Sequence, residues 1–152
     1  MKTAWIDATR EGEPSLKDLN AVGVHHERLD VDAENFQPAL DALATARGYV
    51  EQDIVELRPE TPGLDALCAK FADEHLHTDD EVRFVLEGEG IFDLRSQDDA
   101  WMRVTVERGD LLVVPAELHH RFFLTESSHI RCVRLFKDAS GWVPHYRNGA
   151  PD

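Results

Sequence analysis

The spacing of hydrophobic and polar positions changes near residue 80. Before it, apolar residues recur in places at the three- and four-residue intervals of amphipathic helices. After it come short runs rich in Val, Ile and Phe, separated by Gly, Pro, Asp or Ser: EVRFVLEG, EGIFDLR, MRVTVER, DLLVVPAE, HHRFFLTE and HIRCVRLF. Short strands divided by turn residues are typical of an antiparallel sandwich or barrel, and that is the fold class we predict.

The first part of the chain mixes helices with strands. We expect short strands over residues 2–7 and 49–57, and helices over residues 33–47 and 64–71. No linker of distinctive composition separates this part from the strand-rich part that follows.

Proline, glycine and threonine mark the ends of the two predicted helices. Pro38 favours a start of the first helix close to it, and Gly48 follows its last turn. Thr61 is expected to cap the second helix, with Pro62 at its first position, because a threonine oxygen accepts from the N–H groups of a first turn.

Composition and charge argue against several classes of partner. The 152 residues include 30 acidic and 16 basic ones, giving a net charge of −14. An acidic surface repels phosphate groups, so we expect neither nucleic acid nor an anionic membrane as a partner. No apolar run has the length of a signal peptide or a transmembrane helix. Cys68 and Cys132 lack the spacing of a disulfide framework, which favours a cytoplasmic location.

The segment FADEHLHTDDEVRF contains a candidate metal site. His75 and His77 would point about 200° apart on a helix, but they share a face of an extended chain. Glu81 has the same parity, so an extended segment presents all three side chains together. Two imidazoles and a carboxylate suit Fe(II), Ni(II), Mn(II) or Zn(II). The alternative is a surface histidine pair in an acidic loop.

A fourth ligand is expected from a later strand. The run GDLLVVPAELHHRFF offers His119 and His120, which are adjacent, so only one of them can face a metal from a strand. Parity across Pro115 does not choose between them.

The spacing of these residues resembles the two motifs of the cupin family. The block from His75 to Gly88 fits the first motif, although Ala69 stands where that motif has its leading glycine. Gly109, Pro115 and His120 fit the second motif, which selects His120 over His119; Glu117 and Leu124 replace its second glycine and its asparagine. The resemblance implies a jelly-roll-like antiparallel β-barrel, with the helices of the N-terminal third packed outside.

A closer resemblance is to the acireductone dioxygenase family of cupin enzymes. It lies in AKFADEHLHTDDEVRFVLEGEGIFDLR, WMRVTVERGDLLVVPAELHHRFF and CVRLFKDASGWVPHY, and also in VGVHHERLD and RGYVEQDIVEL. We therefore expect a single domain over residues 1–152, with an N-terminal elaboration over 1–70 and a metal-binding core over 71–140.

This second resemblance implies an enzyme of methionine salvage. One Fe(II) or Ni(II) per chain would be held by His75, His77, Glu81 and His120, leaving two coordination positions open. The implied substrates are O₂ and acireductone, 1,2-dihydroxy-3-keto-5-methylthiopentene. The iron form would give 4-methylthio-2-oxobutanoate and formate, and the nickel form 3-methylthiopropanoate, formate and carbon monoxide. The family also favours a monomer.

The resemblance also assigns residues around the metal. The substrate arginines would be Arg83 and Arg134, the base Asp80, and the aromatic walls Phe71, Phe122 and Trp142. Parity places Arg83 on the same strand face as the glutamate ligand and Phe122 on the face of the histidine ligand.

Some of these assignments have competitors in the sequence. Arg83 could instead form an internal ion pair with Glu81. Arg134 lies in an apolar strand, where a charge needs a partner or a ligand. Parity does not exclude Arg131 as the substrate arginine in its place. Asp80 has the wrong parity for the metal face, so a base there requires a bulge or turn, and a solvated loop carboxylate is the alternative. Trp142 could simply cover the end of the barrel.

Two other functions are compatible with these residues. One is another cupin dioxygenase, whose cavity would not need two arginines. The other is a non-catalytic cupin that binds a small molecule or a metal without consuming O₂.

Overall fold

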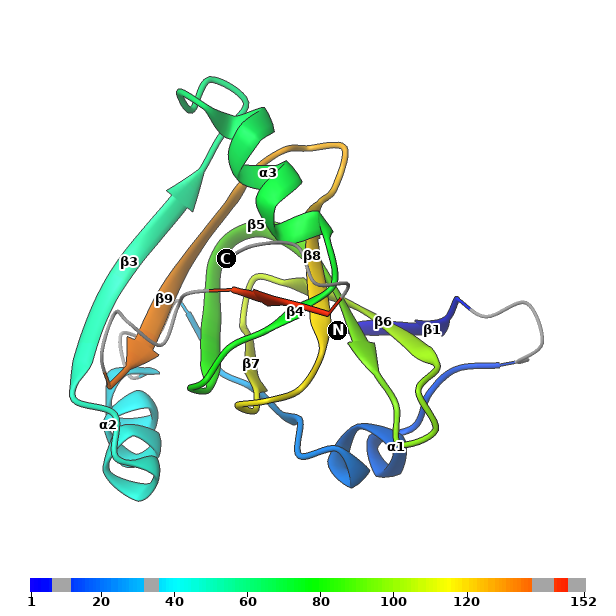
Figure 1. Cartoon of the computed structure of the whole chain (residues 1–152). Helices are drawn as coiled ribbons and strands as arrows, with labels where there is room; N and C mark the ends of the chain where they lie inside the picture. The colour runs from blue at the N-terminus through cyan, green and yellow to red at the C-terminus, as the bar shows by residue number, and fades with distance from the viewer. Residues whose placement is uncertain (7–11, 32–35, 138–143, 148–152) are drawn as a thin grey trace.

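The computed structural model describes residues 1–6, 12–31, 36–137 and 144–147. These residues contain three helices, α1 (Leu16–Ala21), α2 (Phe36–Arg47) and α3 (Leu64–Ala72), and ten strands (Figure 1). The strands are β1 (Lys2–Trp5), β2 (His25–Arg28), β3 (Glu51–Leu57), β4 (His75–Leu76), β5 (Glu81–Arg95), β6 (Trp101–Glu107), β7 (Asp110–Val114), β8 (His120–Leu124), β9 (Ile130–Phe136) and β10 (His145–Tyr146).

Strand β5 organises the fold, because it belongs to both halves of the sheet. Its first half pairs with β7 and β9, and its second half pairs with β6 and β8, always antiparallel. The prediction of two separate strands over this stretch is wrong: one 15-residue strand covers both runs. The strand bends at Gly88, which has a φ of +77°. A Cβ added to Gly88 would lie 2.1 Å from the carbonyl oxygen of His129.

The two halves of the sheet diverge from this strand. One half has the order β2-β7-β5-β9-β3, and the other β1-β6-β5-β8-β4-β10. The mainly antiparallel β class predicted from the sequence is confirmed. The sheet is not a closed barrel, because the ladders among the described strands do not return from one edge to the other.

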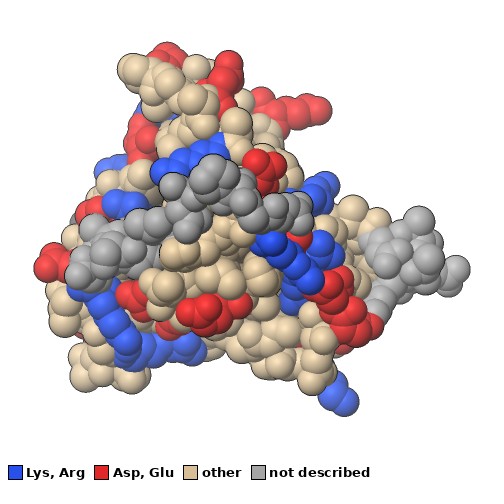
Figure 2. Space-filling model, in the orientation of Figure 1, with Lys and Arg blue, Asp and Glu red and all other residues tan. Residues whose placement is uncertain are grey.

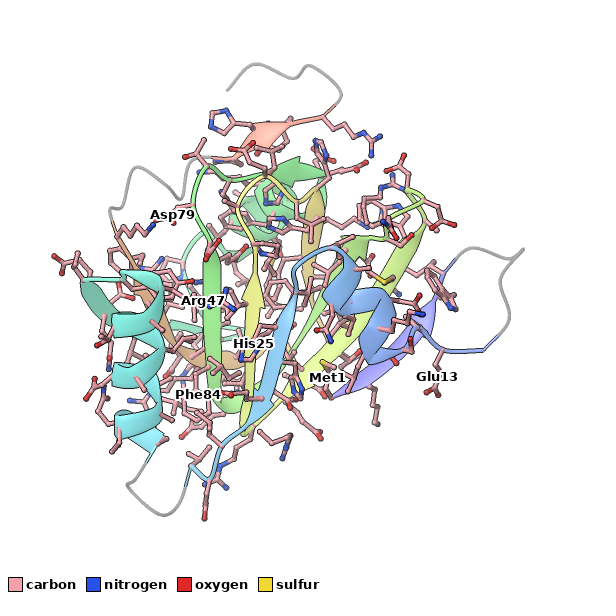
Figure 3. All side chains as sticks on the ribbon, turned by 90° about the horizontal axis from the view of Figure 1, so that it is seen from below. Met1, Glu13, His25, Arg47, Asp79 and Phe84 are labelled. Atoms are coloured by element: carbon pink, nitrogen blue, oxygen red, sulfur yellow. The ribbon has the colours of Figure 1, made fainter. Side chains whose placement is uncertain are left out.

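Two clusters of buried side chains stabilise this arrangement. One lies among β5, β6 and β7 and includes Phe92, Leu94, Met102 and Val104, all at most 1% exposed. The other lies beneath α2, where Phe84 points from β5 toward the helix (Figure 3) and its ring centre is 5.0 Å from that of Phe36.

The N-terminal part contributes strands as well as helices. Strand β3 pairs with β9 over seven residues and lies beside it in Figure 1, while α3 covers the top of the molecule. Helix α2 is described from Phe36 and ends at Arg47, before Gly48, whose φ of +79° terminates it as expected. The sequence reasoning predicted neither α1 nor β2.

The predicted cap of α3 is wrong. Gly63, in a left-handed conformation, is the N-cap residue, so Pro62 lies before the helix rather than at its first position. The hydroxyl of Thr61 accepts instead from the backbone N–H of Arg58, at 2.8 Å. A local turn therefore uses the side chain that the sequence suggested for the cap.

The surface mixes charges of both signs. On the face seen in Figure 2, acidic and basic side chains lie next to one another rather than in separate fields.

Among the described residues, no helix has the length and apolar character needed to span a membrane.

Candidate metal centre

Three histidines meet where β4 runs beside β8. His75 on β4 is the cross-strand partner of His120 at the start of β8, and His77 follows β4 directly. The ring centres of the three imidazoles are 4.6 to 5.2 Å apart, and each offers a nitrogen within 4.8 Å of the others. All three are at most 3% exposed, so they form a buried cluster of metal-binding type.

Glu81 completes the cluster from the first position of β5. Its Oε2 lies 2.8 Å from Nε2 of His120 and 3.6 Å from Nε2 of His77. The chain bends at Thr78 and Asp79, between β4 and β5. Glu81 therefore reaches the histidines from a different strand, rather than by the continuous extended segment that the parity argument assumed.

The hydrogen bonds of two histidines test whether a cation fits here. Nδ1 of His75 lies 2.6 Å from the carbonyl oxygen of Asp73, and Nδ1 of His120 lies 2.9 Å from that of Leu118. A carbonyl oxygen only accepts, so each Nδ1 must carry the hydrogen. In the neutral form of each ring, this leaves a lone pair on Nε2, the usual arrangement of a metal-binding histidine.

The contact between His120 and Glu81 points to the same conclusion. The lone pair of Nε2 faces a carboxylate oxygen at 2.8 Å, and two acceptors at this distance repel unless a cation lies with them. Either a proton or a metal ion satisfies the pair. Three nitrogens and a carboxylate oxygen are a donor set that borderline divalent transition metals accept, so the residues fit a bound metal.

Electrostatics keep these groups in the protonation states that ligands need. Burial and the neighbouring His120 lower the pKa of His75 to about 4, so its ring is neutral at pH 7. Burial alone would raise the pKa of Glu81, but the Arg83 guanidinium beside it lowers that pKa well below its usual range. Glu81 is therefore a carboxylate although it is only 7% exposed.

A cavity of about 180 Å³ opens beside the cluster. Four polar residues line it: His75, Glu81, Arg83 and Arg134. The rest of its wall is apolar apart from a cysteine thiol and is built by Val55, Leu57, Leu67, Phe71, Phe92, Phe122, Ile130 and Cys132. Phe71 and Phe122, which the sequence predicted as aromatic walls, are part of this lining, whereas the contribution of β3 through Val55 and Leu57 was not predicted.

The two cavity arginines each bind a carboxylate. Nη2 of Arg83 lies 2.9 Å from Oε1 of Glu81. Arg134 donates to both carboxylate oxygens of Asp53, with Nε at 2.7 Å from Oδ1. Asp53 comes from β3, directly opposite Arg134 on β9. The sequence reasoning missed Asp53, because only the register of these two strands places it there.

Two of the remaining candidates, Asp80 and Arg131, are not among the residues that line the cavity. The carboxylate of Asp80 accepts from the phenol of Tyr49 at 2.6 Å and from the backbone N–H of Ala116 at 2.8 Å. Nε of Arg131 lies 3.4 Å from Oε2 of Glu56. Trp142 falls outside the described residues.

Fold and site together define a metal-binding protein of the cupin class. A family model described as the ARD/ARD' family matches residues 7–144, and the chain belongs to that family.

Relatives and a solved structure agree with this membership. The chain is 45% identical to the acireductone dioxygenase of Heterostelium pallidum, over 97% of this chain and 99% of that protein. It is also 45% identical to the acireductone dioxygenase of Dictyostelium discoideum, over 86% and 88% of the two chains. The solved acireductone dioxygenase of Bacillus anthracis, with a cadmium ion in its active centre, superimposes with a TM-score of 0.86 at 31% identity, covering 95% of this chain and 96% of that one.

Proposed function

We propose that this chain cleaves acireductone, 1,2-dihydroxy-3-keto-5-methylthiopentene, with O₂ in methionine salvage. The products proposed are 4-methylthio-2-oxobutanoate and formate for the iron form, and 3-methylthiopropanoate, formate and carbon monoxide for the nickel form. One observation carries the proposal: a buried cluster of three histidines and a glutamate adjoins a cavity that holds two arginines. The names of the relatives supply the reaction class.

The proposed cofactor is one Fe(II) or Ni(II) per chain, held by His75, His77, Glu81 and His120. When bound there, such an ion would supply a Lewis acid and a template for the substrate oxygens. The chain's own part is to fix the ligands. The carbonyls of Asp73 and Leu118 hold two of the rings, and Arg83 holds one oxygen of the glutamate.

The polar residues of the cavity suit an anionic enediolate. Arg83 and Arg134 both line the cavity, and their positive charges favour the ionised form of an acid bound between them. The pocket is partly enclosed and largely apolar, so this attraction is weakened less by solvent than at the surface. We propose that the two guanidinium groups hold the oxygen atoms of the substrate.

The apolar part of the cavity suits the methylthio tail. Leu67 and Phe71 from α3, Val55 and Leu57 from β3 and Phe122 from β8 all line the cavity, and the ring centre of Phe71 is 5.9 Å from that of His75. A thioether chain is flexible and apolar, and it packs well against aromatic rings. The cavity thus combines charged groups for the substrate oxygens with an apolar lining for its methylthio tail.

The proton acceptor stays a prediction. Asp80 is the base that the family resemblance implies, but a base must come within hydrogen-bond reach of the proton it removes. With its carboxylate held by Tyr49 and Ala116, Asp80 would have to turn away from both before it could do so. The two cavity arginines support an alternative in which the substrate binds already ionised.

We further propose a monomer that works in the cytoplasm and has neither nucleic acid nor membrane as a partner. The net charge of −14 supports the proposal that neither nucleic acid nor a membrane is a partner. Both described cysteines are free thiols, which suits a reducing compartment.

Anaerobic reconstitution tests the reaction. Metal-free protein is loaded with Fe(II) or Ni(II), mixed with acireductone and then with O₂, and the products are quantified. The proposal expects the keto acid and formate from the iron form, and carbon monoxide from the nickel form alone. Fully loaded protein that gives neither set of products would overturn it.

A further inference from the structure

The carboxylate of Asp80 joins three segments that are distant in the sequence. Oδ2 accepts from the phenol of Tyr49 at 2.6 Å, and Oδ1 accepts from the N–H of Ala116 at 2.8 Å. Tyr49 follows α2, Asp80 precedes β5, and Ala116 lies in the turn between β7 and β8. The Asp80 side chain therefore connects the segment that carries His77 and Glu81 to Tyr49, just after α2, and to the turn that leads into His120.

The two loops are also bound directly to each other. The backbone N–H of Glu117 donates to the carbonyl oxygen of His77 at 2.9 Å. With the bond from Asp80 to Ala116, two successive residues of the turn are held against the segment from 77 to 81. That segment carries His77 and Glu81, and the turn leads into His120. Any shift between these loops would change the distances among the ligand atoms.

Tyr49 is well suited to anchor this arrangement. It is 5% exposed and packs in the core cluster beneath α2, so its ring cannot move without disturbing that core. Burial and the nearby Asp80 carboxylate raise the pKa of the phenol, which keeps it protonated and donating. Arg47, in the last turn of α2, adds a positive charge 3.8 Å from Oδ2 of Asp80. Figure 3 labels Arg47 and Asp79 on this side of the molecule, where the end of α2 approaches the start of β5.

We propose that Tyr49 and Asp80 are positioning residues that fix the segment 77–81 relative to the turn that leads into His120. In this role they serve metal binding rather than proton transfer. This inference rests on the metal centre of the proposed function. It assigns a role to Tyr49, which the sequence motifs did not single out, and a different role to Asp80 from the one that the family resemblance implies.

Two variants separate positioning from proton transfer. Tyr49→Phe keeps the carboxylate but removes its anchor, whereas Asp80→Asn removes the carboxylate. If both residues position the loops, both variants should bind Ni(II) about tenfold more weakly in a chelator competition, as is usual when an outer partner of a ligand is lost. The double variant should be no weaker than Asp80→Asn alone, because the two residues act as one unit.

A control and a spectroscopic readout make the test specific. Asp41→Asn removes an exposed carboxylate from α2, where it accepts from Gln37, and should leave Ni(II) affinity unchanged. In Co(II)-loaded protein the visible bands report ligand geometry, and they should shift in Tyr49→Phe but not in Asp41→Asn. Urea unfolding of the metal-free variants shows whether a loss of affinity follows a general loss of folding.

Two results would overturn the inference. One is unchanged Ni(II) affinity and unchanged Co(II) bands in Tyr49→Phe. The other is an Asp80→Asn variant that binds metal normally and has a kcat lowered more than a hundredfold, while Tyr49→Phe keeps its kcat; Asp80 would then be the base. Wild-type protein that binds metal but does not react with acireductone would refute the proposed function alone, since the affinities are measured without substrate.

Discussion

Arg83 and Arg134 face each other directly across strands β5 and β9. Two like charges in this register destabilise a sheet unless other groups offset them. Here each arginine has a carboxylate beside it, Glu81 for Arg83 and Asp53 for Arg134. The row of charges runs from β3 through β9 to β5 and ends at the metal cluster. A paired positive charge held in this way is a suitable receptor for an anion with two oxygen atoms.

The first prediction concerns Asp53, which we expect to orient Arg134 for the substrate. Asp53→Asn should raise KM for acireductone about fivefold and leave kcat nearly unchanged, a loss of about 1 kcal/mol in binding. The side chain of Asp53 is 39% exposed, so solvent screens its long-range repulsion of the substrate. Its hydrogen bonds to Arg134 are short, and we expect their loss to dominate. Steady-state kinetics measure both constants.

Glu51→Gln is the matched control for Asp53. Glu51 lies on the same strand and the same face, is exposed, and pairs in register with Phe136 rather than with an arginine. Its loss removes the same charge and should leave KM unchanged. Equal effects of the two variants would show that charge, rather than the position of Arg134, matters.

The second prediction decides between two adjacent histidines. His120→Ala should abolish tight metal binding, whereas His119→Ala should retain about one metal ion per chain. The side chain of His120 lies in the buried cluster, and the cluster of described residues does not include His119. Elemental analysis of the purified variants measures the metal content. Loss of metal from His119→Ala alone would contradict the ligand assignment.

The sequence predicted the clustering of the candidate ligands better than it predicted their surroundings. His75 and His77 lie two residues apart, so their shared face follows from local geometry and needs no knowledge of the fold. Glu81 was placed beside them by a parity argument that assumed an unbroken strand, whereas the chain bends before β5. Only the family spacing selected His120, since adjacent residues cannot be distinguished by parity across a turn.

The rest of the site depends on contacts that the sequence does not encode locally. Asp53 meets Arg134 through the register of β3 and β9, and Tyr49 meets Asp80 through the packing of α2. Each pair joins residues far apart in the chain. The bend of β5 was likewise interpreted as a turn between two separate strands, because a glycine within apolar runs suggests a turn as readily as a bent strand.

The third prediction concerns that bend. Gly88→Ala should lower the free energy of unfolding by about 3 kcal/mol or more, because a positive φ and an overpacked contact are both costly. Its new Cβ would lie 2.1 Å from the carbonyl oxygen of His129. Gly63→Ala is the control: its φ of +72° is similar, but no atom lies within 4 Å of the added Cβ. It should cost only about 1–2 kcal/mol. Urea unfolding compares the two, and equal losses would contradict the steric argument.

The fourth prediction concerns stability in acid. Asp110 is buried, which would raise its pKa, but hydrogen bonds from His26, the N–H of Glu107 and Arg28 lower the pKa well below the ordinary 3.8. The folded state thus binds this proton less readily than the unfolded state. Its stabilising contribution is complete above the unfolded pKa and is lost as the pH falls below it.

Asp110→Asn should therefore destabilise the protein by about 2–3 kcal/mol at pH 7, and by less as the pH approaches 3. Urea unfolding of both proteins from pH 7 to pH 3 provides the comparison. Glu27→Gln, which removes an exposed partner of His25, should change stability by less than about 1 kcal/mol at any pH. A constant difference between wild type and Asp110→Asn across this range would show that Asp110 is not the group responsible.

The central claim is that the His75, His77, Glu81 and His120 cluster and the two cavity arginines serve an oxygen-dependent cleavage of acireductone. The most direct measurement is O₂ uptake by protein loaded anaerobically with one Fe(II) per chain and mixed with acireductone. The account predicts consumption of one O₂ per substrate by the wild-type protein, and none by metal-free protein above the rate without protein. Iron-loaded wild-type protein with no uptake above that background would contradict it.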